Sequence, residues 1–346
     1  MSSLATTTAC PDSTTFLTAR GFQSVLLLHI FCSIVALVAN TLFIKTIFPK
    51  IYFHYNIKIL IITAICMNCA HSLIYICLQS VHLYRFLTVV DGCELEFKQS
   101  FCFIFRYPAM IAMFSFVVIN GGIVIERLLA TCLVRNYEET KQYYGPIICI
   151  VTIIISVIMP LTSQTLTPWT EKTPYCNAVT RFSASAISLT SYCMLSFDAF
   201  VIIAYYLVNL INEKRRKCIT YDLRLNYQLR ENSAVFRLLM PWMIFHFIVF
   251  AFFYIANAVI PSMDFITSNA MLQRTIFAIV YIVPEYCALS PLLLWKIYRN
   301  QQAERLRDVQ TLTNLKATGE AYFKGYSWTS ALYYKHLEGL QNVNDK

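Results

Sequence analysis

Three charged side chains lie inside long runs of otherwise uncharged, apolar sequence: Arg106, Asp198 and Glu285. If such runs cross a membrane, each buried charge costs at least about 2.5–3.5 kcal/mol, so charges of this kind mark ion pairs, ligand contacts, or ion and proton paths. Arg106 could pair with an acidic ligand or with Glu285, or form an ion pair that only orients helices. Asp198 and Glu285 could instead be neutral acids, or bind a sodium ion or water between helices. Three histidines lie in similar runs: His29, His71 and His246.

Catalytic motifs do not accompany these charges. The sequence contains no His-x-x-x-His pair, Gly-x-Ser-x-Gly, paired intramembrane Asp motif or Walker-type loop. We therefore expect no enzyme activity, no cofactor and no metal site.

The elements that must position the charges are the apolar runs themselves. Of the 346 residues, 57% are AVILMFWYC and only 14% are DEKR, with a mean hydropathy of +0.54. Soluble domains average about 25% charged residues, so this composition excludes disorder, coiled coil and nucleic-acid binding. A membrane-spanning helix needs about 20 mostly apolar residues. Seven such runs predict an all-α membrane protein, a seven-transmembrane helix bundle, with spans at about 22–48, 57–84, 99–125, 144–166, 182–211, 238–260 and 275–298.

Lysine and arginine divide unequally between the two sides of these runs. Six lie on the side of the N-terminus and 21 on the other, and Arg106 alone lies within a run. Cytoplasmic loops carry the positive excess, so we expect the N-terminus outside and the C-terminus in the cytoplasm. The net charge of +9 is then a topology signal, with a secondary attraction to anionic membrane lipid.

The expected domains follow from this orientation. They are an extracellular N-terminal segment, 1–21, the bundle, 22–298, and a cytoplasmic tail, 299–346. Within the tail, 301–315 is predicted to form a short helix lying on the membrane. A transporter or channel is the alternative class, because the charges and histidines in the runs could form an ion path. The odd number of spans and the lack of an internal repeat favour the first interpretation.

Four of the 13 cysteines fall on the outer side, where disulfides persist: Cys10, Cys93, Cys102 and Cys176. Four cysteines allow three connectivities, and each could also be a free thiol. A bridge between Cys102 and Cys176, which we favour, would fasten the loop after the fourth run over the mouth of the bundle.

An acid and an arginine, Glu126 and Arg127, stand at the inner end of the third run. Such a pair can simply anchor a helix at the membrane interface. However, Arg127 follows Cys102 by 25 residues, about 37 Å of helix, so one helix would carry an outer disulfide and an inner ion pair. This arrangement resembles seven-helix G-protein-coupled receptors.

The sequence also resembles a narrower family. The residues that carry the resemblance are Glu126-Arg127-Leu-Leu-Ala130-Thr131, Tyr137-Glu138, the stretch from Leu225 to Asn232 (LNYQLREN), and Cys93-Glu94 followed by Cys102 and Arg106. They are similar to the nematode serpentine chemoreceptors of the Sra superfamily, with the alpha/beta (Srab) class most similar, over about residues 22–300. The seventh run departs from rhodopsin-like receptors, since Pro284 to Pro291 contains no Asn-Pro-x-x-Tyr.

The resemblance implies a chemosensory G-protein-coupled receptor. Its partners would be a small-molecule chemical cue and a heterotrimeric G protein, with no role for nucleic acid. It would be a multi-pass protein of the plasma membrane, in the cilia of sensory neurons.

The G-protein contact is expected on the inner side. Its candidate residues are Glu126, Arg127, Tyr227, Arg230 and Glu231. A helix leading into the sixth run would carry Leu225, Leu229 and Asn232 at helical spacing, as an exposed ridge for a partner helix. The basic segment 213–217 fits either such a contact or a topology anchor.

The ligand is expected between the outer halves of the helices, because the outer segments are too short to hold a protein ligand. The candidate residues are Arg106, Phe105, Met110, Tyr192, Tyr254, Tyr281 and Glu285, with Phe101, Tyr107, Phe253 and Phe277 as further aromatic walls. Asn40, in the middle of the first run, is expected to bond a neighbouring helix.

Overall fold

The computed structural model describes residues 17–51, 53–90, 92–133, 143–161, 168–176, 182–217, 223–263 and 269–317. The main helices are α2 (Arg20–Thr46), α3 (Tyr55–Thr88), α4 (Gln99–Cys132), α5 (Tyr144–Ile158), α7 (Ala184–Lys217), α8 (Leu223–Val259), α10 (Ala270–Val280) and α11 (Val283–Ala317). Short 3-10 turns lie at Phe48–Lys50, Gly92–Leu95 and Ile260–Ser262, and two strands, β1 (Phe97–Lys98) and β2 (Lys172–Thr173), form one small antiparallel ribbon.

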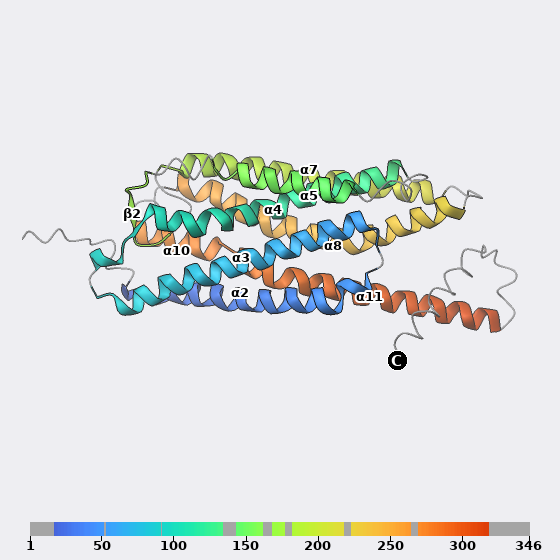
Figure 1. The fold of residues 1–346 in the computed structure, drawn as a ribbon, viewed down its shortest axis with the longest axis horizontal. Coiled ribbons are helices and arrows are strands. Elements are labelled where there is room, and N and C mark those ends of the chain that lie inside the picture. The colour runs from blue at the N-terminus through green and yellow to red at the C-terminus, as the bar shows by residue number, and fades with distance from the viewer. Residues whose placement is uncertain are drawn as a thin grey trace, which may run out of the picture.

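The helices run side by side along one long axis (Figure 1). Six helical segments in the described part of the chain are long and apolar enough to cross a membrane, and they fall at 20–50, 55–88, 99–132, 184–217, 225–262 and 271–311. A seventh, the 15-residue α5, is apolar but shorter. The chain therefore forms a helical membrane bundle of the serpentine kind. The ribbon lies beside a disulfide between Cys102 and Cys176. We call this end of the bundle the disulfide end, and the other end the opposite end.

The helix α4 lies at the centre of the bundle. It packs against α3, α5, α7 and α8, and 78% of its most apolar stretch is buried, compared with 28–56% for the other five long segments. Gly122 permits its close approach to α5, because a Cβ at this position would lie 2.8 Å from Ile148 Cγ2 and 3.2 Å from Thr152 Cγ2. Small residues at helix contacts serve this purpose in membranes.

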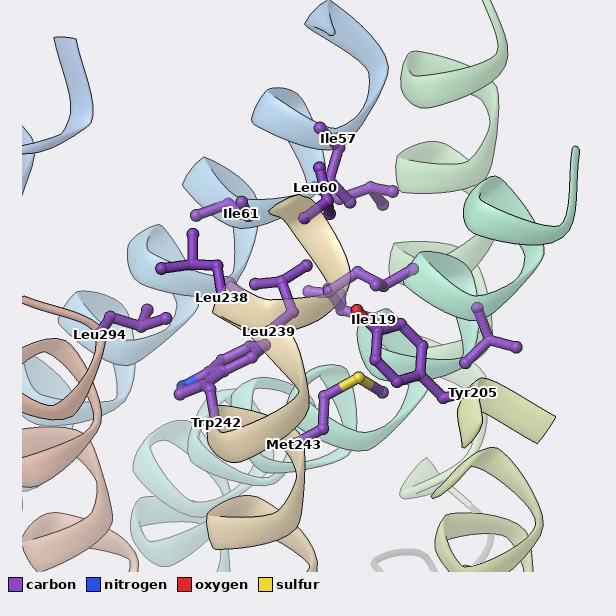
Figure 2. Close-up of a cluster of buried hydrophobic side chains, with 14 of the residues drawn as sticks. Ile57, Leu60, Ile61, Ile119, Tyr205, Leu238, Leu239, Trp242, Met243 and Leu294 are labelled. Carbon is purple, nitrogen blue, oxygen red and sulfur yellow. The ribbon is translucent and has the colours of Figure 1, made fainter. Parts of the chain in front are cut away.

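A cluster of buried apolar side chains joins the helices toward the opposite end (Figure 2). Leu239, Trp242 and Met243 of α8 lie between side chains of α3, α4, α7 and α11. The Trp242 Nε1 donates a hydrogen bond of 2.7 Å to Ser290 Oγ of α11. In α2, Asn40 Nδ2 donates 3.3 Å to the Cys287 carbonyl of α11, as expected of a mid-helix amide that bonds a neighbour.

The seventh predicted span is not one helix. Helix α10 ends at Val280, Tyr281 has non-helical dihedral angles (φ −75°, ψ 74°), and α11 starts at Val283. Pro284 explains the break, because proline has no N–H to donate to the carbonyl four residues before it, and its ring clashes with that carbonyl in a continuous helix. Proline is well tolerated in the first turn of the helix that follows.

Other boundaries also differ from the sequence expectations. The fourth helix ends at Ile158 instead of near 166, and residues 162–167 lie outside the described part. Helix α8 begins at Leu223, so the polar stretch before the sixth span is helical, as predicted. Helix α11 runs without interruption to Ala317 (Figure 1). The predicted separate helix at 301–315 is therefore wrong: this segment continues α11 beyond the bundle, since no proline or glycine interrupts it.

Candidate functional site

A loop between α5 and α7 covers the disulfide end. The structure joins Cys102 at the start of α4 to Cys176 in this loop by a disulfide, with a Cα–Cα distance of 5.2 Å. Beside it, Phe97 pairs with Thr173 and Lys98 with Lys172 in the ribbon, and the Gln99 amide donates 3.0 Å to the Glu171 carbonyl. The loop is thus fixed to α4 at two neighbouring points. Cys10 lies outside the described residues, as do Tyr137 and Glu138.

Tyr175, the residue just before Cys176 in the loop, is inserted between helices. Its ring contacts Phe22 of α2 and His82 of α3, with centroids 5.0 Å and 4.7 Å apart, and its hydroxyl accepts 3.2 Å from Gln79 Nε2. Burial raises the pKa of the Tyr175 phenol, and its hydrogen bonds and the nearby charge of Arg106 oppose this change. Tyr175 therefore fills the space between α2 and α3 at this end of the bundle, and we call it the plug. Arg106 lies close to it.

A cavity lies near the disulfide end, between α4, α7, α8 and α10. It encloses about 600 Å³ of space free of atoms, including its open mouth. Its wall consists of Met110, Met113, Phe114, Ile187, Thr190, Ser191, Phe253, Tyr254, Asn257, Phe277 and Tyr281.

The wall is apolar with a few neutral polar groups. Thr190 donates its hydroxyl to the Ala186 carbonyl at 2.7 Å, and Asn257 donates its amide to the Phe253 carbonyl at 2.8 Å. The Tyr254 hydroxyl is buried and has no hydrogen-bond partner among the described residues. Such a wall can hold an apolar molecule and orient it through a single polar group.

The structure brings only some of the predicted ligand residues to this cavity. Met110, Tyr254 and Tyr281 line it, together with Phe253 and Phe277. The remaining candidates lie elsewhere: Arg106 is buried beside the plug, Phe105 packs near the disulfide, Tyr192 is 52% exposed on the outer face of α7, and Glu285 has His29 Nε2 at 4.0 Å. Phe101 also packs near the disulfide, and the Tyr107 hydroxyl donates to the Val157 carbonyl.

Titratable side chains lie behind the cavity in two groups. At the break between α10 and α11, the Tyr281 hydroxyl is 2.8 Å from His71 Nε2, and the two rings stack. Across the bundle, Asp198 Oδ2 of α7 is 3.6 Å from His246 Nε2 of α8, and His246 Nδ1 is 3.1 Å from the Tyr286 hydroxyl of α11. Among the described residues no set of three or more His, Cys, Asp or Glu side chains could hold a metal ion.

The pair Glu126 and Arg127 lies at the opposite end, fully buried. Arg127 donates two hydrogen bonds of 2.5 Å to the two carboxylate oxygens of Glu126, a bidentate geometry. Its third contact crosses to α8, where Arg127 Nη1 donates 3.0 Å to Asn232 Oδ1, and Asn232 Nδ2 returns a bond of 3.3 Å to the Ala130 carbonyl. Glu126, Arg127 and Asn232 thus form a hydrogen-bonded set that joins α4 to α8, and we call this set the polar lock.

The other predicted coupling residues lie at the start of α8. Tyr227 is 59% exposed and Arg230 is also exposed, whereas the Glu231 carboxylate accepts 2.9 Å from the His54 amide between α2 and α3. The exposed ridge predicted here is wrong, because Leu229 and Asn232 are 1% and 2% exposed. Helical spacing identifies one face of a helix but does not say whether that face meets a partner or the bundle itself.

Sequence reasoning missed several residues that the geometry brings into these sites. Asn232 was part of the quoted motif, yet its contact with Arg127 depends on how α8 packs against α4. Ser191 and Asn257 line the cavity without charge or aromatic character to single them out. Tyr175 plugs the bundle from a loop, where a sequence carries no periodicity.

The chain forms an apolar helix bundle with a disulfide-fixed loop and a cavity toward one end and a buried acid-arginine pair toward the other. These features together define a receptor-like serpentine membrane protein. Comparison with known sequences gives the family. The family model "Serpentine type 7TM GPCR receptor class ab chemoreceptor" matches residues 7–329. The chain therefore belongs to the class ab serpentine chemoreceptor family.

Proteins similar to this chain include serpentine receptors of Caenorhabditis elegans. Serpentine receptor class beta-16 is 20% identical over 92% of this chain and 94% of its own length, and class beta-17 is 24% identical over 88% and 85%. Serpentine receptor class alpha/beta-14 is 24% identical over 66% of this chain and 60% of its own. The sequence resemblance to the alpha/beta class is thereby confirmed.

Proposed function

We propose that this chain is a chemosensory receptor that binds a small molecule in the cavity between α4, α7, α8 and α10 and activates a heterotrimeric G protein at the opposite end. The observation that carries the proposal is the cavity itself, which is lined by aromatic, methionine and small polar side chains. Concave, mostly apolar sites with a few polar groups are typical of small-molecule binding.

The disulfide end faces the outside in this proposal. The Cys102–Cys176 bridge belongs in an oxidising compartment, and lysine and arginine gather on the other side of the spans. The receptor then resides in the plasma membrane, where family resemblance suggests the cilia of sensory neurons.

The G protein contacts the opposite end. Arg127 holds Glu126 and Asn232 in the resting bundle, so separation of α8 from α4 would expose its guanidinium to a partner. Tyr227 and Arg230 already face solvent on the same stretch of α8. Glu126→Gln should therefore raise agonist-independent nucleotide exchange, whereas Arg127→Ala should abolish exchange and leave ligand affinity within a few-fold.

The test is a screen of small molecules for stimulated guanine-nucleotide exchange, with the full chain in nanodiscs and a purified heterotrimer. Each hit is repeated on Ser191→Leu, which adds a side chain to the cavity wall. The matched control is Ser196→Leu, the same exchange on an exposed position of the same helix. We expect Ser191→Leu to reduce potency at least tenfold, and Ser196→Leu to leave it unchanged.

Two results would contradict the proposal. Equal responses in Ser191→Leu and wild type would place the ligand elsewhere. Substrate uptake or current in proteoliposomes without a G protein, combined with no nucleotide exchange, would make the chain a transporter or channel instead.

A further inference from the structure

The wall of the cavity contains no charged side chain. Five of its eleven residues carry polar groups, and all five are neutral hydroxyls or amides: Thr190, Ser191, Tyr254, Asn257 and Tyr281. From this wall we infer that the receptor takes an uncharged, largely apolar ligand that bears one carbonyl or hydroxyl oxygen, and that Tyr254 binds this oxygen. This inference rests on the proposed function of the cavity as the ligand site.

A charged ligand would find no partner in this wall. Transfer of an ion out of water is costly unless an opposite charge or several hydrogen bonds receive it. The ionisable groups of the surrounding helices are not among the wall residues: Asp198 lies 3.6 Å from His246, Glu285 lies 4.0 Å from His29, and Arg106 lies near Tyr175. The cavity therefore selects against carboxylates and amines, including the acidic ligand that the sequence suggested for Arg106.

Helix α8 supplies the polar group that we expect to bind the ligand oxygen. Tyr254 and Asn257 are three residues apart, so they share a face of the helix, and both line the cavity. The Tyr254 hydroxyl is buried without a hydrogen-bond partner among the described residues, and such a group gains a bond when a ligand supplies an acceptor. The Asn257 amide is already bonded to the Phe253 carbonyl, so its side-chain oxygen can accept from a ligand hydroxyl.

The rest of the wall favours adaptable apolar contact. Met110 and Met113 are flexible and polarizable, and they line the cavity together with the rings of Phe114, Phe253 and Phe277. Methionine and aromatic side chains together accept either flat or flexible carbon skeletons. The hydrogen bond to Tyr254, and not the shape of the skeleton, then decides between ligands of equal size.

The experiment measures direct binding to the full-length chain in nanodiscs. The probes are four matched sets of equal carbon skeleton: ketones, hydrocarbons, carboxylic acids and primary amines. We expect ketones to bind most tightly, hydrocarbons up to about tenfold more weakly for the loss of one hydrogen bond, and the charged sets not measurably. Tyr254→Phe should bring ketones and hydrocarbons to equal affinity, whereas the control Tyr206→Phe, which removes a hydroxyl from an exposed tyrosine of α7, should preserve the difference.

Each contrary result has a distinct meaning. Tight binding of acids or amines that Ser191→Leu abolishes would overturn the ligand class and keep the cavity as the site. A ketone preference that survives in Tyr254→Phe would overturn the role of Tyr254. Absence of binding in all four sets, or binding that Ser191→Leu does not affect, would overturn the inference and the proposed site together.

Discussion

Two buried polar sites, one toward each end of the bundle, differ in how their side chains are bonded. Near the disulfide end, the helices leave a cavity, and Tyr254 keeps a buried hydroxyl without a partner among the described residues. At the opposite end, Glu126, Arg127 and Asn232 satisfy one another in a closed set of bonds between α4 and α8. A buried polar group without a hydrogen-bond partner can bind a ligand directly, whereas the bonds within a fully bonded set must break before a partner protein can bind its members.

This difference predicts which end tolerates change. Substitutions around the cavity should alter ligand affinity with little loss of stability, because space is already present. Substitutions in the lock should destabilise the resting bundle, because each member is buried and bonded. Four groups of variants measure what the bonded contacts contribute, from the largest expected effect to the smallest.

Arg127→Ala should have the largest effect. It leaves the Glu126 carboxylate buried without its bidentate partner, which costs about 3–5 kcal/mol for a buried pair. We expect a marked fall in thermal stability in nanodiscs, and a smaller fall for the double variant Glu126→Gln, Arg127→Met, which removes both charges. Equal losses in the two variants would mean that the charge pair does not determine the stability of this end.

Loss of the disulfide should have the second largest effect on stability. Loss of such a bridge typically costs about 2–5 kcal/mol. Cys102→Ser and Cys176→Ser should each lower surface expression, and the double variant should be no worse than either, because both remove one bond. Cys193→Ser, at an exposed free cysteine of α7, serves as the control. Additive losses would argue against this pairing as the reason for the effect.

Asn232→Ala should have a moderate effect on the resting state. It removes the bond to Arg127 and the bond to the Ala130 carbonyl, and a hydrogen bond to a charged group is worth about 1.5–3 kcal/mol. Agonist-independent nucleotide exchange should rise at equal surface density. The same substitution at Asn300, which is exposed on α11, should have no effect. A quiet Asn232→Ala receptor would show that α8 is held by other contacts.

Ser290→Ala should have the smallest effect, because it removes the hydrogen bond to Trp242 between α8 and α11 and only one side-chain oxygen. The expected loss of unfolding free energy is about 0.5–1.5 kcal/mol. Trp242→Phe should cost more, because it also removes part of a buried ring, and the two changes together should cost less than the sum of their separate costs. Full additivity in thermal unfolding would mean that the bond does not couple these helices.

The sequence was informative wherever a local pattern determines the structure. Apolar length located the helices, and the acid and arginine of Glu126 and Arg127 stood out as charges at the end of a span. The sequence was not informative where the packing of helices determines the structure. No local pattern predicts that Asn232 of α8 bonds Arg127 of α4, or that Tyr192 is exposed while Tyr254 lines a cavity. The break at Tyr281 had a visible signal in Pro284, which the apolar run concealed.

The proposed function couples the cavity to the polar lock: ligand binding near the disulfide end should release Arg127 at the opposite end. The most direct test measures nucleotide exchange on a purified heterotrimer, with and without a binding ketone, for wild type, Ser191→Leu, Glu126→Gln and the double variant. The account predicts that Ser191→Leu loses the ligand response, that Glu126→Gln exchanges without ligand, and that the double variant keeps this high exchange and ignores the ligand. A ligand response that survives in Ser191→Leu, or an unchanged basal rate in Glu126→Gln, would contradict it.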